Sequence, residues 1–365
     1  MKNLKRSVLT LDKRIKEHAE ILCDWSAEVE EDDKVLISAN NQAQELVKAL
    51  YEEIGKRNAM PITVSSNPEA QSLFLEKTEE FKTPSHLKAL YEESDVFINI
   101  KSSDNLRALN NVASQKLAKH SKSMKPIQEL VEDKRWVLTQ HPTKNQAQMA
   151  QMSYEEYKDF VYDSIILDWE EIYEKQEKLV KKLEEGKEVK IKGPNTDLAM
   201  SIKGTVPKNS CGKKNMPSGE VFTAPVFTSV EGKISFDLPI IYQGKEIENT
   251  ELKFEKGEVV EFDAEKGKDH LDQILEIDEG SNRVGELGIG TNRGIDKFTK
   301  NILFDEKIGN TIHLALGRAI EGTIGDENKR NDSAIHVDMI RNMDNSKLLI
   351  DGEEILSEGK FFWEK

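Results

Sequence analysis

Lys34-Val35-Leu36-Ile37-Ser38 is the stretch from which the fold of the first half of the chain can be read. An apolar run this short, between polar segments, is typical of a buried strand. Helical spacing of apolar residues follows over residues 43–54, with Gly55 just past its end, and Pro61-Ile62-Thr63-Val64-Ser65 is the next strand-like run. This order of strand, helix and strand predicts an open α/β sheet.

The same alternation continues along the chain. A helical region extends to about Tyr91, residues 95–100 and 135–139 have the pattern of further strands, and residues 106–117 have helical spacing. Strands separated by helices favour a mostly parallel sheet. None of these strands is followed by a glycine-rich turn, so the pattern gives no indication of a nucleotide site.

A chain of 365 residues is longer than one hydrophobic core usually serves, so we expect two domains. Residues 153–184 have the pattern of one long helix, which Ser153 and Glu156 begin as a capping box and Gly186 ends. We place the boundary there, which predicts an α/β N-terminal domain over residues 1–187 and a second domain over residues 188–365.

The second domain changes character and is predicted to be a strand-rich α+β domain. Residues 263–277 have the pattern of its one clear helix. Short strands are expected at residues 189–191, 198–202, 220–223, 233–236 and 252–254.

The composition argues against several classes of partner and indicates a cellular compartment. The net charge of -15 argues against a nucleic-acid partner, which needs a basic stripe, and against an anionic membrane surface. Cys23 and Cys211 are the only cysteines, which suits a reducing cytoplasm and excludes a disulfide framework. No apolar run approaches the ~20 residues that a membrane span needs, so we expect a cytoplasmic protein.

His336-Val337-Asp338 is the sharpest local signal for chemistry. If residues 335–339 form a strand, alternate side chains share a face, and His336 and Asp338 project together about 7 Å apart. Both could then reach one site. The alternative is a solvated pair on an edge strand.

Glu286 lies in Gly285-Glu286-Leu287-Gly288-Ile289-Gly290, where glycines leave room around a carboxylate. A glutamate with such neighbours is rarely a surface charge, and the alternative is a glutamate at a turn. Residues 288–294 also approach a dinucleotide fingerprint. They have three residues in place of two before the last glycine, and no βαβ unit surrounds them.

Three more residues complete the inventory. Glu220 follows a turn and opens an apolar strand, which fits a site residue or a simple strand-start glutamate. His313 has apolar neighbours, so we expect a buried histidine that is either a ligand or a hydrogen-bonded core residue. Glu306 is flanked by Asp305 and Lys307. This charged triplet is as typical of a surface turn as of a functional site.

Buried charges are costly unless they are compensated, and a metal centre is the simplest compensation. The second domain offers three or four carboxylates and two imidazoles. This set of ligands suits two divalent ions, each of which could be Zn²⁺, Co²⁺ or Mn²⁺. Two metals ~3.5–4 Å apart would polarise a carbonyl and lower the pKa of a bridging water.

These segments resemble the metallo-aminopeptidases of the aminopeptidase T family, thermophilic-type exopeptidases with co-catalytic metals. The resemblance covers most of the chain and is most specific after residue 195. Matching blocks lie at residues 219–225, 285–292, 305–317 and 336–338, and residues 136–143 and 195–198 fit more weakly.

The resemblance implies metal ligation by Glu220, Glu286, His313, His336 and Asp338. It implies that Glu306 is a ligand or an acid/base, that the second domain is catalytic, and that the chain forms a homodimer. One position departs from the family pattern: the tyrosine seven residues after the block histidine is Ile320 here. Ile320 has no polar atom, and loss of one oxyanion donor typically costs about 10²–10³ in rate.

We therefore expect a metal-dependent aminopeptidase that releases N-terminal amino acids from peptides through a metal-activated water, with Glu220 or Glu306 carrying the proton. Ile320 leaves two alternatives open, a metal-dependent hydrolase of another amide or amino-acid derivative and a catalytically impaired family member. A non-catalytic protein that keeps the metals as a structural staple is a further alternative.

Overall fold

The computed structural model describes residues 12–326 and 328–365, which form two compact units. Unit 1 holds the chain up to Ile166 together with Gly212–Pro217, and unit 2 holds Leu167–Cys211 and Ser218–Lys365. Among the described residues, no helix combines the length and the apolar character that a membrane crossing requires.

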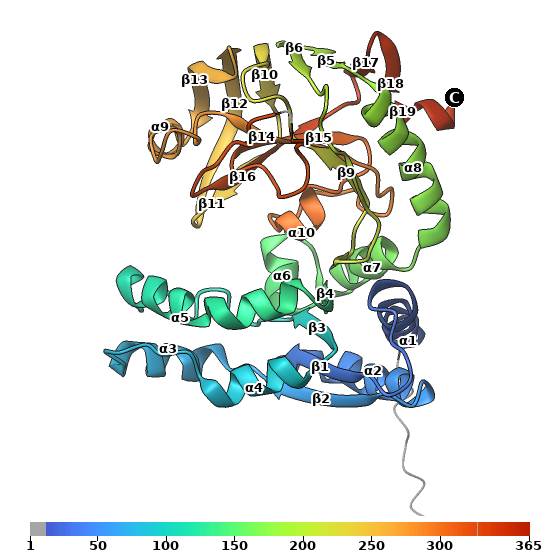
Figure 1. Ribbon diagram of the computed structural model, residues 1–365, viewed down its shortest axis with the longest axis vertical. Coiled ribbons are helices and arrows are strands. Elements are labelled where there is room, and N and C mark those ends of the chain that lie inside the picture. The colour runs from blue at the N-terminus through green and yellow to red at the C-terminus, as the bar shows by residue number, and fades with distance from the viewer. Residues whose placement is uncertain (1–11, 327) are drawn as a thin grey trace, which may run out of the picture. The chain divides into compact units, whose positions relative to one another are not determined.

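Unit 1 is an open α/β unit, as the alternation of strands and helices predicts (Figure 1). Its described strands form one parallel sheet in the order β2-β1-β3-β4-β8. The strands are β1 Lys34–Ala39, β2 Met60–Ser65, β3 Val96–Lys101, β4 Arg135–Gln140 and β8 Asn215–Met216. The α-helices are α1 Lys13–Ile21, α2 Gln44–Lys56, α3 Pro68–Lys77, α4 Ser85–Glu93, α5 Ser114–Glu132, α6 Lys144–Met149 and α7 Tyr154–Ile165.

Two helix predictions need correction. Residues 106–111 form turns, in which the side chain of Asn105 accepts a hydrogen bond from the backbone of Arg107, and the helix begins only at Ser114. The long helix expected over residues 153–184 is two helices, α7 and α8 Trp169–Glu185, because Asp168 caps a new helix by accepting from the backbone of Glu171.

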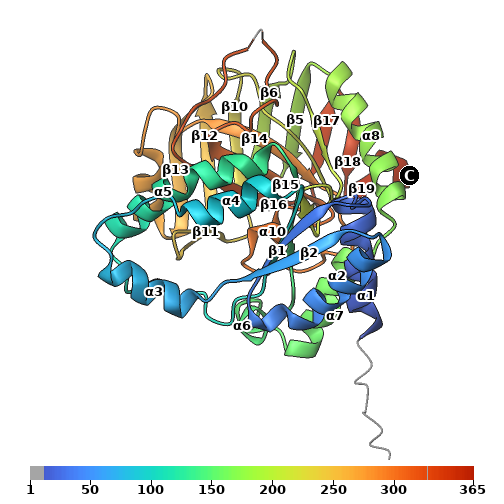
Figure 2. The same ribbon diagram turned by 60° about the horizontal axis from the view of Figure 1, so that its bottom comes forward.

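Unit 2 is rich in antiparallel strands (Figure 2). Within the described residues, one sheet has nine strands in the order β11-β12-β10-β6-β5-β17-β18-β19, with β13 beside β12, and a second has five in the order β16-β15-β14-β9-β7. The strands of the nine-stranded sheet are β5 Glu188–Gly193, β6 Thr196–Ser201, β10 Glu231–Phe236, β11 Ile240–Tyr242, β12 Lys245–Glu255, β13 Glu258–Lys266, β17 Lys347–Ile350, β18 Glu353–Ser357 and β19 Lys360–Phe361. Those of the five-stranded sheet are β7 Lys208–Ser210, β9 Glu220–Thr223, β14 Val284–Gly290, β15 Thr311–Gly317 and β16 His336–Asn342.

The helix expected over residues 263–277 is shorter in the structure. Residues up to Lys266 extend β13, which pairs with β12, and α9 spans only Lys268–Leu275. A further short helix, α10, spans Ile302–Asp305.

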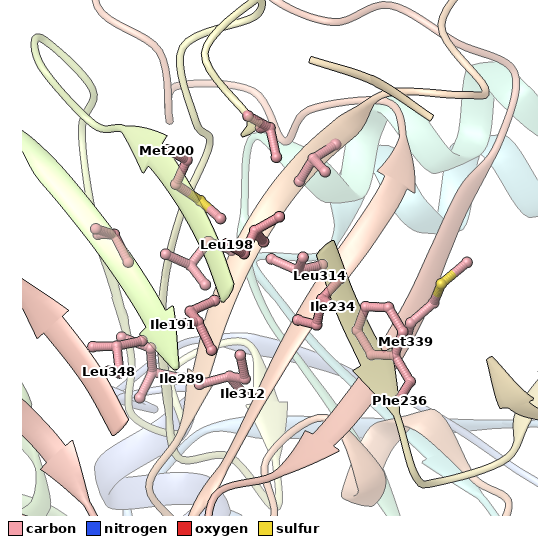
Figure 3. Packing of buried hydrophobic residues seen from close by; sticks show 14 of the residues in the cluster. Ile191, Leu198, Met200, Ile234, Phe236, Ile289, Ile312, Leu314, Met339 and Leu348 are labelled. Carbon is pink, nitrogen blue, oxygen red and sulfur yellow. The ribbon is translucent and has the colours of Figure 1, made fainter. Parts of the chain in front are cut away.

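The core of unit 2 lies between its two sheets. Ile191, Leu198 and Ile234 come from the nine-stranded sheet, and Ile312 and Leu314 from the five-stranded one, and they pack together (Figure 3). Because side chains alternate between the faces of a strand, burying one face of the five-stranded sheet leaves its other face for different residues.

Candidate metal centre

The five-stranded sheet of unit 2 has two unlike faces. Its core face carries apolar residues such as Leu287 of β14 and Val337 of β16, which are buried among the core residues. Residues one position away along each strand point to the opposite face. That face carries the five residues expected as metal ligands: Glu220 of β9, Glu286 of β14, His313 of β15, and His336 and Asp338 of β16.

Strand register brings these side chains together. His313 lies directly across from Gly288, and a Cβ at that glycine would lie 2.0 Å from the imidazole, so the ring occupies the space that the glycine leaves. Ala315 lies between Glu286 and Asp338 on the neighbouring strands. The small residues in these rows make room for the long polar ones.

Two groups of potential ligand atoms result, and Glu286 belongs to both. In each group, one ligand atom of every residue lies within 4.8 Å of the others: Glu220, Glu286 and His313 form the first, and Glu286, His336 and Asp338 the second. His313 Nε2 is 3.2 Å from Glu286 Oε1 and 3.6 Å from Glu220 Oε2. His336 Nε2 is 3.4 Å from Asp338 Oδ1 and 3.9 Å from Glu286 Oε2.

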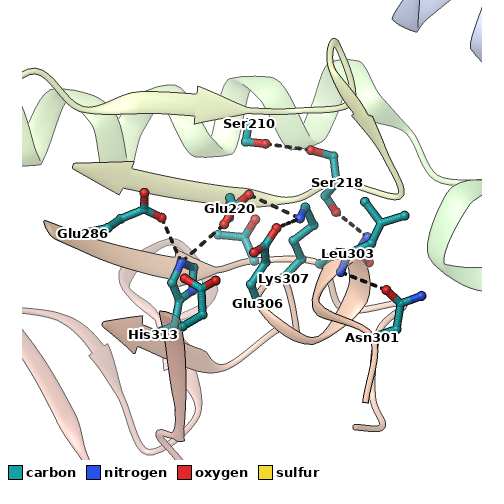
Figure 4. Close-up of polar contacts among 12 residues, drawn as sticks. Ser210, Ser218, Glu220, Glu286, Asn301, Leu303, Glu306, Lys307 and His313 are labelled. Atoms are coloured by element: carbon teal, nitrogen blue, oxygen red, sulfur yellow. Dashed lines mark hydrogen bonds and ion pairs between the residues drawn. The ribbon is translucent and has the colours of Figure 1, made fainter. Parts of the chain in front are cut away.

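Glu306 and Lys307 reach the same cluster from the segment after α10 (Figure 4). The ammonium of Lys307 pairs with Glu306 and lies 3.5 Å from Glu220 Oε1. The Lys307 side chain is 0% exposed and that of Glu306 is 19% exposed. The alternative of a charged surface turn is therefore wrong.

Lys307 is the site residue that sequence reasoning missed. A lysine that follows two acids looks solvated, whereas in the structure its side chain is fully buried and contacts Glu220, which is distant in sequence. Asp305, its other acidic neighbour, is 2% exposed and accepts hydrogen bonds from the backbone of Thr299 at 2.7 Å and of Asn301 at 2.8 Å. Burial raises the pKa of Asp305 to about 7. The signal available in the sequence was the apolar Ile302-Leu303-Phe304 just before the charged triplet.

Asn292 ties three parts of the site together. Its backbone N–H donates to Lys307 O at 3.1 Å, and its side chain donates to Ser218 O at 2.7 Å. Gly219 packs so close to Asn292 that an added Cβ would lie 2.7 Å from the Asn292 Cβ. The dinucleotide interpretation of residues 288–294 is wrong, because Gly288 and Gly290 lie inside β14 and not in a turn before a helix.

The electrostatics of the cluster favour cations. Burial opposes protonation of His313, but its hydrogen bond with Glu286 and the charge of Glu220 outweigh burial and raise the pKa of His313 to about 10. Burial also opposes protonation of His336, but the contact with Asp338 and the charge of Glu286 outweigh burial and raise the pKa of His336 to about 9. Burial raises the pKa of Glu286 above its ordinary value. Crowded carboxylates thus draw protons onto the histidines.

The donor set fits divalent metal ions. His336 Nδ1 donates to Arg318 O at 2.7 Å, so a neutral His336 ring would direct the Nε2 lone pair toward Glu286 and Asp338, an arrangement typical of metal-binding histidines. Asp338 Oδ1 is buried without a hydrogen-bond partner in the described structure. Carboxylate oxygens and imidazole nitrogens at this spacing are ligands for Zn²⁺, Co²⁺ or Mn²⁺.

Ile320, the position that departs from the expected tyrosine, lies in a turn that follows β15. Its carbonyl accepts hydrogen bonds from the backbone and the hydroxyl of Thr323, and its side chain is partly exposed. The turn is further anchored where Thr205 and Ile324 form an antiparallel bridge. The aliphatic side chain adds no polar atom to the cluster.

Comparison with known proteins shows the family to which the chain belongs. The model of the thermophilic metalloprotease (M29) family matches residues 11–361. The chain is 39% identical over 162 residues to Aminopeptidase AmpS of Bacillus subtilis (strain 168), in a match that covers 40% of this chain and 38% of AmpS. It thus matches about two fifths of the length of that relative.

Two longer matches cover nearly the whole chain. Aminopeptidase PepS of Streptococcus thermophilus is 26% identical over 397 aligned residues, which cover 93% of this chain and 94% of PepS. The solved structure of wild-type AmpT from Thermus thermophilus superimposes with a TM-score of 0.84 at 22% identity, over 96% of this chain and 99% of AmpT, which shows a shared fold. Since the family model spans almost all of the sequence, the chain belongs to the M29 family of thermophilic metalloproteases.

Proposed function

We propose that this protein is a metal-dependent aminopeptidase that releases amino acids from the N-termini of peptides. The observation that carries the proposal is the pair of ligand groups that share Glu286 on one face of a sheet. Membership of a metalloprotease family and similarity to proteins named aminopeptidases support the reaction class.

Two divalent ions, Zn²⁺, Co²⁺ or Mn²⁺, are the proposed cofactors. Glu220, Glu286 and His313 would hold one, and Glu286, His336 and Asp338 the other, with Glu286 in reach of both. When bound, such ions polarise a carbonyl and lower the pKa of a water. The carboxylates provide the negative charge that the ions require, and Gly288 leaves the space that the His313 ring occupies.

Glu306 is the proposed proton carrier. It lies at the cluster, yet its side chain keeps 19% of its surface exposed, so it can meet both substrate and solvent. Burial raises the pKa of Glu306 above its ordinary value, and the positive charge of Lys307 opposes this shift. A carboxyl group whose pKa is shifted toward neutral pH can accept and return a proton. Glu220 is the second candidate for this role.

Metal-depleted protein, restored in turn with Zn²⁺, Co²⁺ or Mn²⁺, should be assayed on aminoacyl anilides and on the same compounds with an acetylated α-amine. We expect metal-dependent cleavage of the free-amine substrates only. Cleavage of acetylated substrates or of other amides alone would favour the alternative hydrolase, to which the aliphatic Ile320 points. Absence of turnover with all three metals would refute the proposal.

Three broader expectations also stay proposals. The catalytic part of the chain is residues 188–365, where all six candidate residues lie. The protein works as a homodimer in the cytoplasm, as the family resemblance and a composition with only two cysteines suggest. Light scattering after size-exclusion chromatography would report a mass near 83 kDa for a dimer of the 41.5 kDa chain.

A further inference from the structure

Lys307 is a buried lysine without access to solvent, and lysines are almost never fully buried unless they are paired. Its ammonium contacts Glu306 and lies 3.5 Å from Glu220 Oε1. Both partners are residues of the proposed metal centre. The burial therefore places a permanent positive charge beside the carboxylates that the metals would use.

The contact divides the two oxygens of Glu220 between different partners. Oε1 faces Lys307 at 3.5 Å, and Oε2 faces His313 at 3.6 Å (Figure 4). A carboxylate held at one oxygen by a cation keeps its other oxygen in a defined direction. Lys307 thus orients Glu220 toward the first ligand group.

The backbone of Lys307 is held as firmly as its side chain. Its N–H donates to Phe304 O at 2.9 Å, and its carbonyl accepts from the N–H of Asn292 at 3.1 Å. Asp305 fixes the preceding turn through Thr299. These contacts fix the point beside the cluster from which the Lys307 side chain extends.

We propose that Lys307 is a resident counter-ion, which compensates Glu220 and Glu306 while no metal is bound and so keeps the centre preformed. The inference rests on the proposed metal centre and adds a role for a residue that is not a ligand. Removing one member of a buried pair leaves an uncompensated charge, which is strongly destabilising. Divalent ions compensate the same carboxylates, so the loss should be greatest in the metal-free protein.

The test compares thermal unfolding of wild type, Lys307→Met and Glu306→Gln/Lys307→Met, each with chelator and with Zn²⁺. We expect Lys307→Met to lower the melting temperature by about 10 °C in chelator and by clearly less with Zn²⁺. The double variant, which also removes one carboxylate charge, should regain at least half of that loss in chelator. Lys300→Met is the control, because the Lys300 ammonium pairs at 2.7 Å with Glu246, which belongs to neither ligand group, and both side chains are partly exposed. Its expected shift is small and the same with and without Zn²⁺.

Equal losses with and without Zn²⁺, or a double variant no more stable than Lys307→Met, would overturn the proposal, since a packing role predicts both. If Lys307→Met folds under neither condition, rescue by the added Glu306→Gln supports the counter-ion and lack of rescue refutes it. A wild-type protein that Zn²⁺, Co²⁺ and Mn²⁺ all fail to stabilise would instead refute the metal centre. The comparison of single and double variants in chelator decides the role of Lys307 in that case as well.

Discussion

Gly288→Ala is the substitution that tests the geometry of the centre most directly. The added methyl would lie 2.0 Å from Cε1 and Nε2 of His313, where 3.4 Å is ordinary contact. The ring must therefore move by about 1.4 Å, or the two strands must separate. A shift of this size breaks the 3.2 Å contact between His313 and Glu286.

The expected cost has two parts. Overpacking a buried site costs about 1–3 kcal/mol of stability. Loss of a partner that only orients a ligand weakens metal binding about 10–100-fold, and displacement of the ligand itself should do no less. We therefore expect metal affinity to fall about 100-fold or more, equivalent to about 2.7 kcal/mol.

Isothermal titration of the metal-depleted variant with Zn²⁺ measures the loss of metal affinity, and thermal unfolding measures the loss of stability. Gly55→Ala is the control: an added Cβ meets nothing within 4 Å at this position in α2, and alanine favours a helix. The control should bind metal like the wild type and be as stable or slightly more stable. A folded Gly288→Ala protein with wild-type metal affinity would show that His313 is not held as a ligand here.

Three further outcomes follow from the structure. Glu286→Gln should abolish binding of both metals, whereas Asp338→Asn should leave the metal beside Glu220 and His313 bound. Elemental analysis after dialysis should then find zero ions per chain in the first variant and about one in the second. Equal losses in the two variants would contradict the sharing of Glu286. Chelation should lower the melting temperature of the protein, because it removes ions that bind only the folded chain, and restored Zn²⁺ should reverse it in a calorimetric scan. Burial lowers the pKa of His18 in the folded protein to about 3, below the ordinary 6.5. As pH drops below about 6.5, His18 therefore takes up a proton in the unfolded chain but not in the folded one, and the free energy of unfolding falls. His18→Gln should reduce that slope by up to about 1.4 kcal/mol per pH unit between pH 6 and 4 in urea titrations, and an unchanged slope would contradict a buried neutral His18.

The sequence is a good guide where one local pattern decides the structure. Short apolar runs indicated the four principal strands of the unit 1 sheet, including the more exposed β2 at its edge. Strand alternation placed His336 and Asp338 on one face, and apolar neighbours indicated that His313 is buried. These predictions are confirmed.

The sequence is a poor guide where distant residues decide. Lys307 looks solvated among charges, but its side chain is fully buried and its ammonium lies 3.5 Å from Glu220, which is distant in sequence. Residues 258–266 form β13 because β12 offers a partner, although much of that strand is exposed and carries a weak pattern. In residues 106–111 the apolar spacing is helical, but the side chain of Asn105 stabilises a turn there by accepting a hydrogen bond from the backbone of Arg107. The structure also brings both ligand groups onto Glu286, which spacing along the chain does not reveal.

β8 has a consequence for how the protein is made. It completes the sheet of unit 1 beside β4, yet it begins 75 residues after β4 ends. At a translation rate of about 5–20 residues per second, the ribosome delivers β8 roughly 4–15 s after its partner. The edge of β4 stays open for that time, and an open edge invites pairing with other chains. A gene shortened to end before residue 215 would leave this edge bare for good, so an N-terminal fragment is expected to aggregate during expression.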